Sequence, residues 1–237
     1  MLYEAQTCHL GSDMSCVEIL TVLYFDTLRR NDHFIMSKGH GAAALYATLA
    51  EKGAFEKEKL ATYGQDGTEF LNLVSKEVPG VEFSTGSLGH GLPVAVGLAV
   101  AEKQNESPGN IYTLLSDGEL QCGTTWESAM FASHNKLNNL YIIIDYNRLQ
   151  ACGWINDVVK VEPIDKKFEA FGCTVREVDG HNTKELIKAL NEPSDKPVVI
   201  ISHTIKGKGI PFAENNNAWH YNNLTEALYT RALEALE

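Results

Sequence analysis

Two short stretches of polar residues have types and a spacing suited to holding a metal ion and a phosphate group. Asp117, Gly118 and Glu119 directly follow an apolar run, and Asn147, thirty positions after Asp117, follows the next such run. Asp117 offers a carboxylate, Asn147 an amide oxygen, and the loop near Leu149 a backbone carbonyl. Mg²⁺ prefers octahedral oxygen coordination and commonly combines carboxylates with substrate phosphates. Since Gly118 lets a phosphate approach the backbone, these residues predict a site for Mg²⁺ and a diphosphate.

Each stretch also has a plain structural interpretation. Asp-Gly is a common turn signal, and Asn commonly caps a helix, so neither is specific by itself. Their pairing, one strand–helix–strand unit apart, favours a binding site. In open α/β sheets ligands bind where strands end and helices begin, because backbone N–H groups and the helix dipole point there.

The elements that must place these residues are indicated by apolar runs alternating with helical periodicity. Continuous apolar strands separated by helices are typical of a parallel sheet covered on both faces. We expect strands at 111–115, 140–144, 174–178 and 198–203, and helices at 123–136, 163–171 and 183–190.

The N-terminal third is predicted to be helical, and no linker separates it from the rest. We therefore expect one α/β domain over 1–237, with a helical layer at about 1–105 and a sheet core at about 106–237. Its fold class is a doubly wound, mainly parallel sheet with helices on both faces. The expected N-terminal helices cover about 13–28, 41–52, 56–62 and 92–104.

Composition excludes several classes of function. The 20 basic and 31 acidic residues give a net charge of −11, which argues against binding DNA or RNA. The 5 cysteines are spread out with no C-x-x-C pair, so neither a zinc site nor a disulfide framework is expected. No stretch approaches the about 20 apolar residues of a membrane helix, and no secretory signal begins the chain. We expect a cytoplasmic protein with free thiols and no membrane partner.

The motif at 116–119, followed by Asn147, resembles the thiamine diphosphate motif, which is Gly-Asp-Gly and then Asn some 25–30 residues later. From about Thr7 to the C-terminus, the sequence resembles the N-terminal, diphosphate-binding half of transketolases. The matching blocks are His9-Leu10-Gly11, Ser37-Lys38-Gly39-His40, Pro79-Gly80-Val81-Glu82, Ser84-Thr85-Gly86-Ser87-Leu88-Gly89-His90-Gly91, Trp126-Glu127, Val178-Asp179-Gly180-His181 and Thr204-Ile205-Lys206-Gly207-Lys208-Gly209.

The resemblance implies thiamine diphosphate and Mg²⁺ as cofactors, with roles for particular residues. Asp117, Asn147 and the Leu149 carbonyl would hold the metal. Histidines of the matching blocks would line the channel to the thiazolium ring, where neutral imidazole can both donate and accept. The resemblance assigns catalytic roles to His9, His40 and His181, and cofactor contacts to Gly86, Leu88, Gly118, Glu119, Asn147 and His181. It also suggests that His220 closes the site, and leaves open whether Lys206 and Lys208 touch phosphate.

The chain departs from the transketolase pattern at several positions. Ser116 replaces the first glycine of the motif, a change that should still allow metal binding. Cys122 stands where the family has a glutamate that links paired active sites. A histidine that contacts the donor sugar is missing, and Asn72 and Leu73 fall there instead. The missing histidine points to an altered substrate preference or to impaired transfer.

The resemblance also implies a partner. In transketolases, the glutamate that activates the aminopyrimidine ring lies in a second domain, and this chain ends at Glu237 before such a domain. We expect a separate C-terminal-half subunit with the pyrimidine domain to supply it, in an α₂β₂ assembly that acts on sugars or sugar phosphates. The favoured reaction is transfer of a two-carbon ketol unit from a ketose to an aldose. The alternatives are a related carboligase, resembling deoxyxylulose-phosphate synthase or serving a modified-sugar pathway, and a degenerate scaffold subunit.

Overall fold

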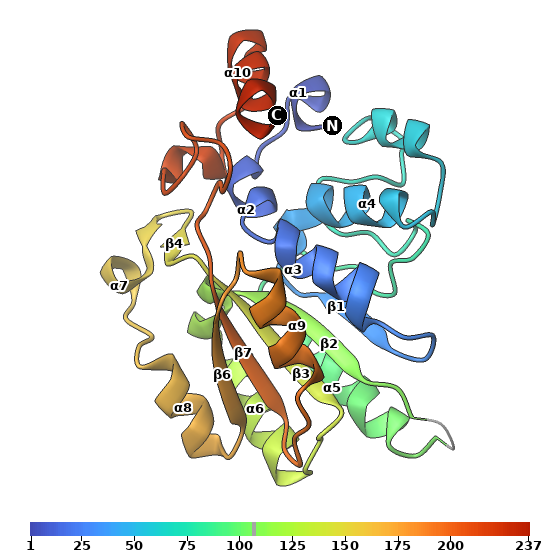
Figure 1. Cartoon of the computed structure of the whole chain (residues 1–237), viewed down its shortest axis with the longest axis vertical. Helices are drawn as coiled ribbons and strands as arrows, with labels where there is room; N and C mark the ends of the chain where they lie inside the picture. Colours follow the sequence, from blue (N-terminus) through green and yellow to red (C-terminus); the bar gives the residue numbers. More distant parts are fainter. Residues whose placement is uncertain (106–107) are drawn as a thin grey trace.

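In a computed structural model of the chain, which describes residues 1–105 and 108–237, five parallel strands form one sheet (Figure 1). Their order across the sheet is β1-β2-β3-β7-β6. The strand bounds are β1 His33–Met36, β2 Ile111–Ser116, β3 Leu140–Tyr146, β6 Thr174–Asp179 and β7 Val198–His203. The four strands expected from the sequence are present, each close to its expected bounds.

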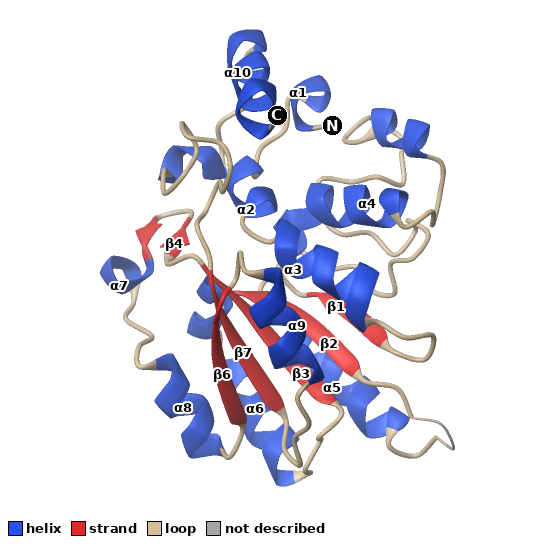
Figure 2. Cartoon of the chain, viewed as in Figure 1, coloured by secondary structure: helices blue, strands red, loops and turns tan. Residues whose placement is uncertain are grey.

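Side chains that alternate along the strands build a separate hydrophobic core on each face of the sheet. On β3, Ile143 lies in one core, whereas Ile142 and Ile144 lie in the other, because successive side chains of a strand point to opposite faces. Figure 2 shows helices on both faces, as expected for a doubly wound α/β fold. One face carries α3 (Val17–Val22), α4 (Ala42–Glu51) and α9 (Thr183–Asn191); the other carries α5 (Gly91–Glu102), α6 (Gly123–His134) and α8 (Ile164–Phe171).

The N-terminal part differs from the expected purely helical layer, because it contributes edge strand β1 to the sheet. This strand has four residues, too few for a clear strand pattern in the sequence. The expected helix 13–28 is divided into α2 (Leu10–Met14), α3 and a π-helical turn at Leu23–Thr27. The expected helix 56–62 is a 3₁₀ helix at Lys57–Thr62.

The two ends of the chain lie together beside α2 (Figure 1). Tyr3 of α1 (Leu2–Ala5) stacks on Tyr229 of α10 (Glu226–Leu236), with ring centroids 4.4 Å apart. Across the described ranges 1–105 and 108–237, no helix is long and apolar enough to cross a membrane. The remaining elements are a hairpin of β4 (Leu149–Gln150) and β5 (Gly153–Trp154), helix α7 (Ile155–Val158), and 3₁₀ turns at Gly39–Gly41, Asp117–Gln121 and Asn217–His220.

Candidate functional site

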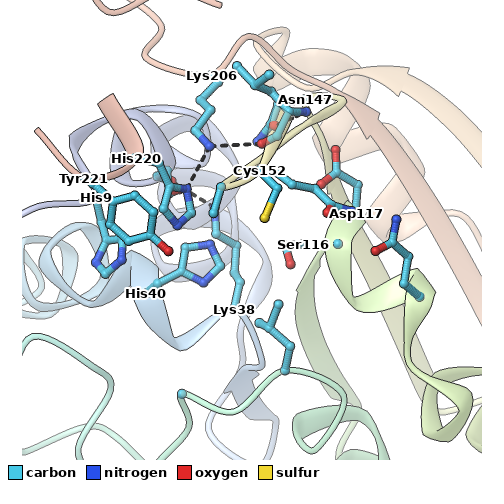
Figure 3. A pocket seen from close by; sticks show the side chains of 18 of the residues that line it. His9, Lys38, His40, Ser116, Asp117, Asn147, Cys152, Lys206, His220 and Tyr221 are labelled. Carbon is cyan, nitrogen blue, oxygen red and sulfur yellow. Dashed lines mark hydrogen bonds between the residues drawn. The ribbon is translucent and has the colours of Figure 1, made fainter. Parts of the chain in front are cut away.

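A pocket of about 370 Å³ lies where several segments meet beyond the carboxyl ends of the strands (Figure 3). The segments after β1, β2, β3 and β7 all contribute to it, as does the turn that begins α2. The lining residues are His9, Ser12, Lys38, His40, Leu73, Gly86, Leu88, Ser116, Asp117, Gly118, Gln121, Asn147, Leu149, Gln150, Ala151, Cys152, Lys206, His220 and Tyr221.

The three expected metal ligands, Asp117, Asn147 and Leu149, all line this pocket. The strand register explains their proximity, since Ser116 at the end of β2 pairs with Asp145 near the end of β3. The Asn147 Oδ1 atom accepts a hydrogen bond of 3.0 Å from the backbone N–H of Leu149, which holds the loop in a tight turn. One carboxylate, one amide oxygen and one carbonyl form an all-oxygen donor set of the kind that Mg²⁺ prefers.

Asp117 is the buried carboxylate of this set, with 2% of its surface exposed. Burial raises the pKa of its carboxyl group to about 7, and the neighbouring Asp145 carboxylate adds to the increase. The backbone N–H of Arg148 donates to Asp117 Oδ2 at 2.5 Å and opposes that increase. Arg148 adopts a left-handed backbone conformation, with φ of 66°, to make this contact. A bound divalent cation would favour the ionised carboxylate.

The wall beside Asp117 presents groups that suit an anion. The three atoms nearest to a Cβ placed on Gly118 all belong to the Gln150 side chain, the closest at 3.6 Å, so the backbone here is not tightly packed and can be approached by a ligand. Gln150 Nε2 is buried and has no hydrogen-bond partner among the described residues. Lys206 Nζ donates to the Leu149 carbonyl at 3.0 Å, and burial lowers the pKa of its ammonium group to about 8. An open glycine, a buried amide donor and an ammonium group together fit a diphosphate.

Three imidazole rings line another part of the pocket, with Tyr221 beside them (Figure 3). Ring centroids of His9, His40 and His220 lie 5.1 to 5.6 Å apart. Burial lowers the pKa of all three rings, and the nearby lysine ammonium groups act in the same direction. The pKa of His220 falls to about 3, and its Nδ1 lies 2.9 Å from Lys206 Nζ. These rings are therefore neutral near pH 7, so each has one nitrogen that donates and one that accepts.

The glycine-rich loop contributes Gly86 and Leu88 to the pocket, as expected from the sequence. A Cβ on Gly86 would come within 2.7 Å of Leu73 Cδ1, so a side chain here would displace Leu73. Leu73, at the position of the missing histidine, also lines the pocket, and its backbone carbonyl accepts from the Tyr46 hydroxyl at 2.9 Å. Leu88 and Leu73 therefore add apolar surface to the pocket.

Two expected site residues lie outside the pocket. His181 is not among the lining residues, and both of its ring nitrogens have protein partners. Its Nε2 accepts from the backbone N–H of Ile205, and its Nδ1 lies 3.0 Å from Glu18 Oε2. The expected catalytic and cofactor-binding roles of His181 therefore do not fit this geometry. The ring instead joins α3 to the segment after β7.

Glu119 also has a structural position instead of the expected contact with the cofactor. It is fully buried, and its carboxylate accepts from the Ser37 hydroxyl and from the backbone N–H groups of Gly89 and Ser116. These bonds tie the glycine-rich loop to the ends of β1 and β2. Glu119 can influence a ligand only through the position of that loop.

Several lining residues could not be assigned firmly from the sequence. The resemblance suggested His220 and left Lys206 open, and it gave no role to Tyr221; all three line the pocket. Lys38 belongs to a matching block, but the resemblance gives it no role of its own. Among the described residues, no group of three or more His, Cys, Asp or Glu could hold a metal. The expected Mg²⁺ ligands differ from such a group, because they include a single carboxylate together with an amide oxygen and a backbone carbonyl.

Comparison with known proteins supports the sequence resemblance. A family model described as the transketolase thiamine diphosphate binding domain matches residues 1–235. The chain is 45% identical over 225 residues to one subunit of the apulose-4-phosphate transketolase of Actinobacillus succinogenes, covering 90% of this chain and 82% of that protein. It is 39% identical over 242 residues to the 6-deoxy-6-sulfo-D-fructose transketolase subunit SqwG of Clostridium sp., covering 97% and 88% respectively.

The fold also matches solved structures. The transketolase of Campylobacter jejuni superposes with a TM-score of 0.92 at 29% identity, over 100% of this chain and 40% of that one. The transketolase of Leishmania mexicana gives 0.91 at 28% identity, over 98% of this chain and 38% of that one. The chain therefore spans about two fifths of these solved transketolases.

Proposed function

We propose that this chain, which belongs to the transketolase family, binds thiamine diphosphate through Mg²⁺ as one subunit of a two-subunit transketolase-like enzyme. The observation that carries the proposal is that Asp117, Asn147 and Leu149 line one pocket together with Gly118, Gln150 and Lys206, whose groups suit an anion. Relatives that are themselves named as transketolase subunits are similar over nearly the whole chain, which supports the two-subunit arrangement.

In this proposal, the wall from Asp117 to Lys206 holds the metal and the diphosphate. Asp117, Asn147 and the Leu149 carbonyl would bind Mg²⁺, and the backbone at Gly118 would face the phosphate oxygens. The Lys206 ammonium, which donates to the Leu149 carbonyl and lies 2.9 Å from His220 Nδ1, would contribute a positive charge to holding the diphosphate. Bound there, the cofactor supplies an electron sink for cleaving a carbon–carbon bond beside a carbonyl group.

The imidazole cluster has the chemistry needed on the substrate side. His9, His40 and His220 are neutral near pH 7, so they can bind sugar hydroxyl groups and carry protons between oxygen atoms. Tyr221 extends the same wall with a hydroxyl group. We assign these residues to substrate orientation and proton transfer.

Completion of the site requires a second chain in this proposal. A pyrimidine-domain subunit would bring the glutamate that activates the cofactor, in an α₂β₂ assembly in the cytoplasm. The substrate class is a ketose or ketose phosphate that donates a two-carbon ketol unit to an aldose. Apulose 4-phosphate and 6-deoxy-6-sulfo-D-fructose are the first donors to test, because they appear in the names of similar subunits.

Leu73 favours one alternative reaction within the same enzyme class. An apolar side chain in the pocket, at the position expected to contact the donor, suits a donor with fewer hydroxyl groups, such as pyruvate. That reaction would be a thiamine-dependent condensation instead of ketol transfer. Product analysis with pyruvate against ketose donors separates the two reactions.

The direct test is calorimetric titration of the chain with thiamine diphosphate, with and without Mg²⁺, alone and with the partner subunit. We expect saturable binding that requires Mg²⁺, and ketol transfer in the presence of the partner. An Asp165→Asn variant, which alters a carboxylate outside the pocket, should bind as the wild type does. Absence of binding in every mixture would refute the proposal and favour a scaffold subunit.

A further inference from the structure

A mostly buried group of five residues lies at the pocket, and two of its members, Ser12 and Lys38, also line it. Lys38 and Asp145 form its centre, with an Nζ–Oδ2 distance of 2.5 Å and side chains that are 1% and 0% exposed. Lys38 Nζ also donates to the Ser12 carbonyl at 2.8 Å, and Asp145 accepts from the hydroxyl groups of Ser15 and Thr204. We call Ser12, Ser15, Lys38, Asp145 and Thr204 the Lys38–Asp145 cluster.

Each segment that contributes to the Lys38–Asp145 cluster also contributes a residue to the pocket two or three positions away. Along the chain, Lys38 precedes His40 by two positions, Asp145 precedes Asn147 by two, and Thr204 precedes Lys206 by two. Ser12 lies three positions after His9, and its N–H donates to the His9 carbonyl at 2.8 Å. The Lys38–Asp145 cluster therefore connects four segments that are distant in sequence. These segments carry the residues expected to bind the metal, the phosphate and the substrate.

Stability alone does not account for an ion pair in this position. Removing two charges from water costs about as much as their attraction returns, and well-packed apolar residues of similar volume often stabilise a fold equally well. A buried, fully bonded pair does, however, hold its partners in one geometry. In this chain, that geometry sets where His40, Asn147 and Lys206 lie.

We propose that Lys38 and Asp145 are positioning residues, whose buried pairing holds the metal, phosphate and imidazole groups of the pocket in register before any ligand binds. The inference rests on the proposed function only for the identity of the ligand. The ordering of the pocket residues is independent of that function. Loss of the pair should leave the fold intact while the four segments move independently.

The test is the charge-free double variant Lys38→Met/Asp145→Leu. We expect an unfolding midpoint near that of the wild type and an affinity for thiamine diphosphate with Mg²⁺ lowered by about 10- to 100-fold, the usual effect of removing outer groups that orient metal ligands. The histidine ¹³C NMR signals of His9, His40 and His220 should shift or broaden in the ligand-free variant.

The matched control is Phe168→Leu, in the core beneath α8 and away from the pocket. It should lower the unfolding midpoint but leave both the affinity and the histidine signals unchanged. Should the double variant fail to fold, Thr204→Val removes one hydroxyl bond to Asp145 and should produce smaller changes of the same kind.

Wild-type affinity together with unchanged histidine signals in the double variant, or in Thr204→Val if the double variant does not fold, would overturn the inference. If the wild type itself binds no cofactor, the proposed function fails. In that case, the histidine NMR signals of the wild type and the variant still decide whether Lys38 and Asp145 position the pocket residues.

Discussion

At the residue scale, the pocket brings charged and neutral groups together. The Asp117 carboxylate and the Lys206 ammonium line it with imidazole rings whose low pKa values keep them uncharged, and Lys206 Nζ lies 2.9 Å from His220 Nδ1. Burial is the first cause of each of these shifts. The imidazole rings carry no positive charge, so they would not compete with a bound metal ion for the diphosphate. They would remain free to carry protons.

Replacing Asp117 tests the metal site directly. Asp117→Asn keeps the size of the side chain and can still accept from the Arg148 N–H, but it removes the only carboxylate of the expected metal set. We expect the affinity for Mg²⁺ with thiamine diphosphate to fall by at least about tenfold. Calorimetry measures the affinity. An unchanged value would remove Asp117 from the metal site.

Replacing His40 tests the imidazole wall. The ring has one donating and one accepting nitrogen, and His40→Asn retains polarity but places its groups elsewhere. We expect kcat of the enzyme reconstituted with its partner to fall by about 100-fold, the usual effect of losing a positioned proton carrier. Cofactor affinity should change by less than about threefold if this ring serves the substrate. A large loss of cofactor affinity with little change in kcat would contradict this role.

At the element scale, the segment after β1 and the glycine-rich loop approach so closely that no side chain fits between them. A Cβ on Gly39 would lie 2.5 Å from both the carbonyl carbon and the oxygen of Thr85. Backbone atoms cannot move away as the end of a flexible side chain can. The loop that carries Gly86 and Leu88 therefore depends on glycine at position 39.

Gly39→Ala should push the glycine-rich loop away from the segment after β1. Overpacking of this kind costs about 1 to 3 kcal/mol of unfolding free energy. We expect that loss in denaturant titrations, together with weaker cofactor binding. Gly97→Ala in α5 is the matched control, because a Cβ there meets no atom within 4 Å beyond its own stretch of helix. Equal stability of the two variants would contradict the close approach.

A second contact between elements should depend on pH. Asp13 of α2 accepts from the backbone N–H of Ala44 in α4 at 3.1 Å, and burial raises the pKa of its carboxyl group from 3.8 to about 7. The folded chain thus binds this proton more tightly than the unfolded chain. The Asp13 contribution to stability is present below about pH 4 and is lost as the pH rises to about 7.

Asp13→Asn should remove this pH-dependent contribution and keep the bond from Ala44. Relative to the wild type, the variant should gain on the order of a few kcal/mol of unfolding free energy between pH 4 and pH 7. Urea titrations of both proteins at several pH values give the difference. Parallel curves would show that Asp13 has the same pKa in the folded and unfolded chains.

At the scale of the whole molecule, the chain corresponds to about two fifths of a solved transketolase, and similar proteins are named as subunits. The pocket opens beyond the carboxyl edge of the sheet, with exposed apolar residues near it that include Leu73 and Tyr221. Such a site suits completion by a second chain.

We expect the isolated chain to show no ketol transfer and the mixture with its pyrimidine-domain partner to be active. The partner should also tighten cofactor binding, because two surfaces would then hold one ligand and binding and assembly would favour each other. Activity measured against partner concentration, with the molar mass of the complex from light scattering, checks both expectations. Full activity of the isolated chain would refute the two-subunit proposal.

The sequence by itself predicted four of the five strands in the described sheet, the family, and the pairing of Asp117 with Asn147 at one edge of the sheet. Four strands could be predicted because buried parallel strands are apolar runs bounded by turns. Asp117 and Asn147 could be paired because adjacent parallel strands end at the same edge of the sheet. His9 and His40 could be selected because they fall within blocks of a known order.

Only the tertiary structure decided which polar residues face the pocket. His181 and Glu119 lie in or beside matching motifs, but their hydrogen bonds hold neighbouring segments instead. Lys38 and Asp145 are 107 positions apart, so no local pattern could pair them. His220 reaches the pocket because its backbone carbonyl accepts from the His9 N–H. Contacts of this kind depend on how distant segments pack, whereas sequence periodicity reports only on one segment at a time.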